Sequence, residues 1–370
     1  MEPKKTPLYD MHVNLGAKLV DFHGWLMPVQ YASVLKEHEA VREAAGLFDI
    51  SHMGVIDIIG PGAVKLADYV LTNDIKTLKT GRARYSPMCN EAGGTMDDVV
   101  VYKLGDTLLR LVVNAANTQK DFDWITAHNK EQAEVADRSD RYALIALQGP
   151  RSSEVVRAVD AKGQLPTRAY SLLTGARLAG VGCMLARTGY TGEIGYEFFC
   201  APGDAPILWE ALLTAGEALG ARPCGLGARD SLRLEAGMPL YGNELREDIT
   251  PLEAGLHAFV DMDDPGFVGG EALMQSVRRR RVGFVMDGRG IPRAGYEVED
   301  GDGCVIGAVT SGGYGPTLGA GLGMALVQNA WSDIDSLFIR IRDRLVPAHT
   351  APLPFYRRKQ IIKEDGHGGT

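Results

Sequence analysis

The sequence predicts an α+β protein of more than one domain that ends in a small β-barrel. At 370 residues the chain is longer than one hydrophobic core usually needs, since domains run to about 100 to 200 residues. Strand and helix patterns alternate between residues 51 and 139. From residue 282 onward, short β-type runs alternate with turns rich in glycine and proline, which is typical of a barrel or sandwich.

Helical spacing defines the first element. Residues 34–45 carry apolar side chains three or four positions apart, with Ser33 as the expected N-cap and Gly46 as the expected stop. The stretch "GVIDIIGPGAVKLADYVL" predicts a strand, a turn and a helix, and "TLLRLVVN" before "QKDFDWITAHNKEQ" repeats that order. These two units predict an α+β domain over about residues 51–139. A later helix is predicted from "ILWEALLTAGEALGA".

Composition excludes several classes of protein. The formal net charge of −8 argues against a nucleic-acid binder, because phosphate contacts need a basic face. Five scattered cysteines without a C-x-x-C pair indicate neither a disulfide framework nor a zinc site. We find neither an apolar run of about 18 residues nor the apolar stretch of a signal peptide. We therefore expect no membrane association and a cytoplasmic location, or a compartment reached after removal of a presequence.

Two adjacent carboxylates open a predicted strand in "GGTMDDVVVY". Successive strand residues point to opposite faces, so Asp97 and Asp98 cannot share one role, and one of them is expected to face inward. A carboxylate at the edge of a core needs a partner, which makes it either a structural acceptor for loop N–H groups or a poised acid/base. The residues alone favour the structural role by roughly two to one.

Residues 188–197, "TGYTGEIGYE", combine three glycines with several hydrogen-bonding side chains. The pattern fits a plain turn between strands. It fits equally a loop whose backbone lets a flat ligand approach while Tyr190 and Glu197 bind it. Both interpretations stay open at this point.

Two arginine-containing stretches carry weaker signals. "GLGARDSLRLE" lacks the third glycine of a dinucleotide fingerprint, because Asp230 stands there, so no nicotinamide cofactor is expected. Arg229 and Asp230 fit an anion site at a helix start, although a local surface ion pair is the preferred interpretation. The run Arg278–Arg281 lies where the composition changes, and we interpret it as a solvated linker, with docking of an acidic partner as the alternative.

In their order and wording, these motifs resemble the family of folate-dependent aminomethyltransferases, the T proteins of the glycine cleavage system. The resemblance covers almost the whole chain. The matching blocks are, in order, "TPLYDMHVNLGAKLVDFHGWLMPVQY", "GLFDISHMG", "ARYSPMCNEAGGTMDDVVVY", "LVVNAANTQKD", "LQGP", "RTGYTGEIGYE", "CGLGARDSLRLEAGMPLYG", "VTSGGYGPTLG" and "PFYRR".

The resemblance implies a three-domain cloverleaf around a central hole that binds folate. Residues 1–50 and 140–275 would form a discontinuous folate-binding α+β domain, residues 51–139 an inserted α+β domain, and residues 282–364 the C-terminal β-barrel domain. The implied reaction passes the aminomethyl carbon from the lipoyl arm of a lipoylated H protein to tetrahydrofolate. Its products are 5,10-methylenetetrahydrofolate, ammonia and reduced lipoyl. Neither a metal nor a redox cofactor belongs to this reaction.

The resemblance also assigns roles to single residues. Asp97 falls at the catalytic aspartate, where it would accept a proton and help ammonia leave, and Asp98 is left with a structural role. Glu197 matches the glutamate that binds the pterin, and Arg229 matches an arginine that pairs with the folate through its glutamyl carboxylates. The glycines of residues 188–197 would let the chain turn beside the flat ring. Further residues implied to line the folate pocket are Tyr190, Tyr85, Asn114 and Met53.

Two alternatives keep the folate but change the function. One is a tetrahydrofolate-dependent demethylase of a small methylated compound, whose pocket needs no channel for a lipoyl arm. The other is a non-catalytic folate-binding protein. The full set of blocks, with both Asp97 and Glu197 present, favours the aminomethyltransferase.

Overall fold

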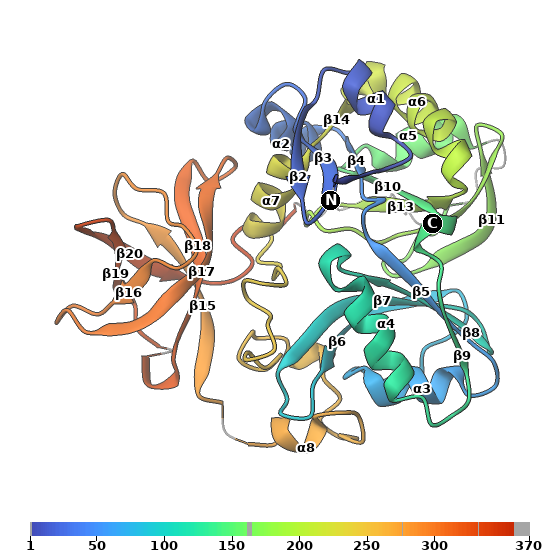
Figure 1. The fold of residues 1–370 in the computed structure, drawn as a ribbon. Coiled ribbons are helices and arrows are strands. Elements are labelled where there is room, and N and C mark those ends of the chain that lie inside the picture. The colour runs from blue at the N-terminus through green and yellow to red at the C-terminus, as the bar shows by residue number, and fades with distance from the viewer. Residues whose placement is uncertain (1, 161–164, 276, 332, 359–370) are drawn as a thin grey trace, which may run out of the picture.

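The chain folds into three lobes, each built on its own sheet, as Figure 1 shows for this computed structural model. The structure describes residues 2–160, 165–275, 277–331 and 333–358. The barrel lies to the left in Figure 1, and the other two lobes lie one above the other to its right. The α+β class predicted from the sequence is confirmed.

The upper lobe contains a six-stranded sheet in the order β11-β12-β13-β10-β4-β14. Strands from distant parts of the chain meet in it, because β4 pairs with β10 across about a hundred intervening residues. Its strands are β4 (Gly46–Asp49), β10 (Ala143–Gln148), β11 (Leu172–Leu178), β12 (Val181–Ala186), β13 (Gly195–Cys200) and β14 (Arg222–Pro223). A small sheet beside it contains β1 (Lys4–Lys5), β2 (Lys18–Phe22) and β3 (Trp25–Gln30).

Amphipathic helices cover this sheet and bury its apolar face. In α6, Trp209 and Leu212 are fully buried in the same core as Ile145 and Phe198 of the strands. Each such side chain contributes roughly 1.5 to 3 kcal/mol of hydrophobic stabilisation. The helices of the upper lobe are α1 (Tyr9–Asn14), α2 (Val34–Glu43), α5 (Ser152–Val159), α6 (Ala205–Gly216) and α7 (Leu226–Glu235). The short helix α8 (Gly270–Leu273) lies instead beside the lower lobe, where Leu273 packs in one cluster with Cys89 (Figure 1). The 3-10 turns are η2 (Ser139–Arg141), η3 (Pro202–Asp204), η4 (Glu217–Leu219) and η5 (His257–Phe259).

The lower lobe is a five-stranded antiparallel sheet in the order β6-β7-β8-β5-β9, with two helices packed on its core. Both predicted strand–helix units are present in it, as β5 with α3 and β8 with α4. Its elements are β5 (Gly54–Ile59), α3 (Ala63–Val70), β6 (Arg82–Cys89), β7 (Thr95–Gly105), β8 (Leu108–Val113), η1 (Ala115–Asn117), α4 (Thr118–Ala127) and β9 (Glu134–Asp137).

The third lobe is the predicted barrel, closed by pairing of its first strand with its last. The strand order is β15-β18-β17-β16-β19-β20, and closure leaves no unpaired sheet edge. Its elements are β15 (Arg279–Met286), β16 (Glu297–Glu299), β17 (Val305–Gly315), β18 (Ala320–Gln328), η6 (Asn329–Trp331), β19 (Ser336–Ile341) and β20 (Arg344–Ala351).

The predicted ends of the first long helix and the predicted linker were confirmed only in part. Ser33 caps α2 as predicted, because its Oγ accepts a hydrogen bond from the backbone N–H of Lys36 at 3.3 Å. Gly46 as the stop of that helix was wrong: α2 ends at Glu43, and Gly46 lies in β4, where an added Cβ would come within 2.3 Å of Val41. The linker interpretation of Arg278–Arg281 was also wrong, because β15 begins at Arg279.

The proposed domain division stays a prediction, and residues 359–364 of its last domain lie outside the described residues. Within the described ranges, no helix is long and apolar enough to cross a membrane. In the same ranges, no group of three or more His, Cys, Asp or Glu side chains has a metal-binding arrangement.

Candidate active site

The two carboxylates of β7 face opposite sides of the sheet, as alternation predicts. Asp97 is fully buried and accepts three hydrogen bonds. The backbone N–H of Asn114 reaches its Oδ2 at 3.0 Å, while the side-chain amides of Asn114 and Asn117 reach its Oδ1 at 2.8 and 2.7 Å. Because Asn114 follows β8 and Asn117 opens α4, Asp97 fixes the connection between this strand and this helix.

Asp98 is half-buried and has a different environment. The Tyr85 hydroxyl donates to its Oδ2 at 3.0 Å, and the Asn114 side-chain amide donates to its Oδ1 at 2.9 Å. Burial, helped by the negative charge of Asp97, raises the pKa of Asp98 to about 7, although the bonds from Tyr85 and Asn114 act in the opposite direction. Asp98 can therefore bind and release a proton near neutral pH.

A third carboxyl group lies behind Asp97. Asp121 of α4 is fully buried, and neither of its oxygens accepts a hydrogen bond from the described residues. Burial and the neighbouring charge of Asp97 raise the pKa of Asp121 to about 11. Asp121 is therefore neutral at physiological pH, because an ionised carboxylate without donors is too costly in this place.

Glu197 reaches the site from β13 of the upper lobe. Its Oε2 accepts hydrogen bonds from the hydroxyl groups of Tyr102, at 3.1 Å, and Thr188. Both bonds that the described residues make to this carboxylate go to Oε2. Its Oε1 is thereby available to a ligand, since an ionised carboxylate has further acceptor positions on each oxygen.

Arg229 and Tyr190 form a stacked pair on the α7 side of the site. The guanidinium carbon of Arg229 lies 4.8 Å from the centre of the Tyr190 ring, a distance at which cation–π attraction operates. Arg229 has neither an ion pair nor a side-chain hydrogen bond with the described residues. Burial lowers its pKa, and nearby Tyr190 and Glu197 counteract this. The predicted surface ion pair with Asp230 was wrong, because Asp230 pairs with Arg233 at 2.7 Å.

Tyr190 connects the two halves of the site. Burial raises its pKa, and the negative charge of Asp98 acts in the same direction, whereas the positive charges of Arg233 and Arg229 lower it. Its hydroxyl donates to the backbone carbonyl of Pro239. We call Tyr85, Asp97, Asp98, Asn114, Tyr190, Glu197 and Arg229 the central site.

Comparisons with known proteins show which family this chain belongs to. Residues 8–264 match the GCVT N-terminal domain model, and residues 279–357 match the glycine cleavage T-protein C-terminal barrel domain model. The chain belongs to the glycine cleavage T-protein family.

Individual members of this family agree over nearly their full length. An aminomethyltransferase of Halothermothrix orenii is 46% identical over 357 residues, which cover 95% of this chain and 99% of the relative. One from Moorella thermoacetica is 48% identical over 361 residues, covering 96% and 98%. The crystal structure of the glycine cleavage system aminomethyltransferase T from Bartonella henselae has a TM-score of 0.89 at 36% identity, covering 96% of this chain and 99% of that one. The chain is accordingly an enzyme with the role of a glycine cleavage system aminomethyltransferase.

Two glycines of residues 188–197, which were expected to let the chain turn beside a flat ligand, pack against another side chain. A Cβ added at Gly189 would lie 1.9 Å from Oε1 of Gln148, and one at Gly195 would lie 2.2 Å from its Nε2. These two glycines therefore make room for the buried amide of Gln148, which also bonds Thr188 and Thr191. Gly192, with a φ of 79°, serves the tight turn itself.

The predicted site residues are not all in contact with one another. Tyr85, Asp97, Asp98 and Asn114 form one hydrogen-bonded group. Met53 packs instead on the apolar core between the two right-hand lobes and, among the described residues, makes no polar contact with the other site residues. Its neighbour His52 is buried next to Arg229, and burial together with that positive charge lowers the pKa of His52 to about 4.

The sequence analysis missed several contributors. They are Asn117, Asp121, Tyr102, Thr188 and Gln148. "NAANTQKD" offered a signal for two of them, because Asn117 and Asp121 are four residues apart and so share one helical face.

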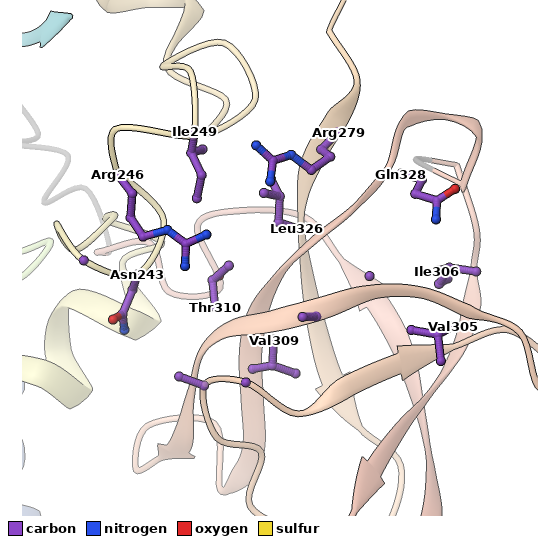
Figure 2. Close-up of a pocket in the computed structure, with 15 residues that line it drawn as sticks. Asn243, Arg246, Ile249, Arg279, Val305, Ile306, Val309, Thr310, Leu326 and Gln328 are labelled. Carbon is purple, nitrogen blue, oxygen red and sulfur yellow. The ribbon is translucent and has the colours of Figure 1, made fainter. Parts of the chain in front are cut away.

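A separate hollow of about 430 Å³ lies between the barrel and residues 242–249 (Figure 2). Arg246 and Arg279 point toward one another across it, but both are engaged, with Asp248 and Glu253 respectively. None of the predicted site residues lines this hollow.

Proposed function

We propose that this enzyme transfers the aminomethyl carbon from the lipoyl arm of a lipoylated H protein to tetrahydrofolate. The carbon–sulfur bond to the lipoyl group and the carbon–nitrogen bond to the departing amine are broken, while two bonds to folate nitrogens form. Those nitrogens lose their two protons, which end on the lipoyl thiol and on ammonia. The product is 5,10-methylenetetrahydrofolate. The observation that carries the proposal is that Asp98, a carboxyl group with a pKa near 7, belongs to the same site as Glu197 and as Arg229, which has no ion pair with the described residues.

The family resemblance assigns the proton transfer to Asp97, and this assignment stays a prediction. The contacts favour Asp98 for the same role. Asp97 is fully buried, and amide donors occupy both of its oxygens, whereas Asp98 is half-exposed. A catalytic acid/base works best with a pKa near the working pH, which Asp98 has. In our proposal Asp98 exchanges the proton with the reactants. Asp97 positions the side-chain amide of Asn114, which in turn donates to Asp98.

Glu197, Tyr190 and Arg229 are proposed to bind the folate. Glu197 Oε1 accepts from the N–H donors of the pterin, while Tyr102 and Thr188 hold the other oxygen in place. Tyr190 offers a ring face for the flat ligand. Met53 is proposed to contribute an apolar wall, which the half-buried position of its side chain permits.

We propose a cytoplasmic location for this reaction. Of the five cysteines, four are buried as free thiols and Cys304 is exposed as a free thiol. Free thiols of this kind persist in reducing compartments. No metal enters the proposed mechanism, which depends on positioning two bound partners and on one carboxyl group.

The test is ammonia release from aminomethyl-loaded H protein by the purified enzyme, with and without tetrahydrofolate. Strong dependence on tetrahydrofolate, with methylenetetrahydrofolate as product, is the expected result. Absence of release from an enzyme that binds folate would contradict the proposed donor. The demethylase and the non-catalytic binder would then be tested with methylated compounds.

A further inference from the structure

The first turn of α4 buries a carboxyl group that accepts no hydrogen bond. Asp121 is fully buried, and no N–H or O–H group of the described residues donates to either of its oxygens. The neighbouring ammonium group of Lys120 donates instead to the carbonyl of Met96 at 2.7 Å and to the hydroxyl of Tyr241 at 2.6 Å. The same group lies 3.3 Å from Oε1 of Glu247. An ionised Asp121 would therefore lack both a donor and a paired cation, which is costly in a buried place.

Asp97 lies beside Asp121 and has the opposite surroundings. It is also fully buried, but N–H groups of Asn114 and Asn117 donate to both of its oxygens. Burial raises the pKa of Asp121, and the charge of Asp97 and a hydrogen bond between the two side chains raise it further. Donors stabilise an ionised carboxylate, and their absence favours the protonated form. Of this adjacent pair, Asp121 therefore carries the proton and Asp97 the negative charge.

The spacing along α4 brings the pair together. Asn117 is the N-cap residue of this helix, and its side-chain amide reaches Oδ1 of Asp97 at 2.7 Å. Asp121 is four residues further on, so its side chain lies on the same helical face, one turn along. The strand β7 supplies Asp97, and α4 supplies both of the side chains that face it. The contact therefore joins the strand to the start of the helix.

We propose that Asp121 is a positioning residue, which donates its carboxylic acid O–H to Asp97 and so keeps Asp97 ionised and fixed in orientation. Asp97 in turn accepts from the side-chain amide of Asn114, which donates to Asp98 at 2.9 Å. The negative charge of Asp97, after burial, is also what raises the pKa of Asp98. Asp121 touches no reacting group and acts through Asp97. The inference rests on the proposed function, in which a carboxyl group of β7 exchanges a proton.

Few other charged groups face this pair. Apart from Asp97, the charges that act on Asp121 are those of Lys120, which favours ionisation, and Asp98, which favours the protonated form. The hydroxyl of Tyr241 is affected by the charge of Asp97 but is held by Lys120. None of these groups donates a hydrogen bond to Asp121. A substitution of Asp121 therefore reaches the rest of the site through Asp97.

The test is the pH dependence of single-turnover ammonia release by full-length Asp121→Asn and Asp121→Leu. Asparagine can still donate to Asp97, whereas leucine is similar in size and has no donor. In Asp121→Leu, Asp97 should bind a proton more readily, by about tenfold, and the acid limb of the profile should move up by about one pH unit. Asp121→Asn should keep the wild-type acid limb and most of the rate. Asp123→Asn and Asp123→Leu, at an exposed position of the same helix, are the controls and should follow the wild type.

The other outcomes would overturn the inference. If Asp121 were ionised, both variants would remove a negative charge, and the acid limb would move to lower pH in both. A limb that moves in neither variant would show that Asp121 does not act through Asp97. Should Asp121→Leu fail to fold, Asp121→Asn and the infrared measurement below decide.

Infrared difference spectra between the ligand-free wild type and Asp121→Asn detect the proton itself. At about pH 9, where ordinary carboxyl groups are ionised, the wild type should show the carbonyl stretch of a protonated carboxyl group that the variant lacks. Carboxylate bands in its place would refute the inference, whatever the activity. A wild type that shows the protonated band but releases no ammonia with tetrahydrofolate would refute the proposed function and leave the proton on Asp121.

Discussion

Two groups of buried charges in this molecule are organised in opposite ways. The first, which we call the paired cluster, contains His38, Arg42, Glu193 and Glu235. Arg42 contacts Glu193 at 3.0 Å and Glu235 at 3.1 Å, and His38 lies 3.2 Å from Glu235. In the central site, by contrast, the half-buried Arg229 has no ion-pair partner among the described residues.

From the difference we infer that a charged side chain without partners is a better candidate for ligand binding than one that is merely buried. In the paired cluster, Arg42 lies between two carboxylates, and Glu235 also accepts a hydrogen bond from the backbone N–H of Thr317 at 2.8 Å. We interpret such a cluster as one that stabilises the fold. Arg229 has no such partner among the described residues, so we expect it to contribute little to the stability of the free protein and to gain a partner when a ligand supplies a negative group. The following substitutions test this contrast.

The largest effect is expected at Asp98. Asp98→Asn should lower kcat by about 10²- to 10⁴-fold, because an amide cannot exchange the proton. Single-turnover ammonia release measures this, and tetrahydrofolate affinity should change little. Asp97→Asn is the matched variant: a larger loss of kcat there, with the fold intact, would restore the reacting role to Asp97.

The stability of the same variant, relative to the wild type, should depend on pH. Because the folded-state pKa of Asp98 is raised to about 7, well above the unfolded value, its contribution to stability is fully present at low pH and is lost as the pH rises through 7. Asp98→Asn should therefore gain most in stability relative to the wild type above pH 7, and this gain should shrink as the pH falls and disappear below about pH 4, near the unfolded pKa. Thermal melts in which the difference between the two proteins does not change with pH would contradict the raised pKa.

Breaking the paired cluster should reduce stability. Glu235→Gln leaves Arg42 with only one of its two carboxylate partners, and breaking a buried ion pair costs about 3 to 5 kcal/mol. Although burial opposes it, the bond from His38 lowers the pKa of Glu235, so this stabilisation is present at neutral pH and is lost as the pH falls through that lowered value. Denaturant unfolding measures the loss. Glu134→Gln, at an exposed pair with Arg138, is the control and should change little.

A smaller loss is expected at Glu197. Glu197→Ala removes the carboxylate proposed to accept from the pterin, and folate affinity should fall roughly tenfold or more. Calorimetric titration with tetrahydrofolate checks this. Because Glu197 is held by Tyr102 and Thr188, the conservative variant Glu197→Gln should retain part of the affinity. Undiminished binding by Glu197→Ala would remove this residue from the folate site.

The smallest change in stability is expected at Arg229. Arg229→Gln should leave the melting temperature of the ligand-free protein unchanged or raise it by a few degrees, since the cation has no counter-charge to lose. Folate should stabilise this variant less than it stabilises the wild type. A clear destabilisation without ligand would mean that Arg229 is part of a paired network after all.

The features predicted correctly from the sequence are those that depend on residues close together along the chain. Strand–helix order, the barrel and the opposite orientations of Asp97 and Asp98 all follow from local periodicity. Which of the two carboxylates faces inward depends on the pairing of β7 with β6, where Asp97 lies opposite Met88, and no local pattern contains that register. The packing of Gly189 and Gly195 against Gln148 likewise requires a contact across about forty residues.

The attachment of the barrel determines how this enzyme unfolds. Thr317 of the barrel donates to Glu235 at the end of α7, and Asn243 bonds Ser311 of β17. The backbone N–H of Tyr356, beyond the last strand, also bonds the carbonyl of Glu235. Because all three contacts converge on α7 and the segment after it, melting of the barrel should loosen the helix that carries Arg229. A calorimetric scan should accordingly show the barrel and the central site lost in a single cooperative transition, so heat inactivates the enzyme without leaving a folded, folate-binding remnant.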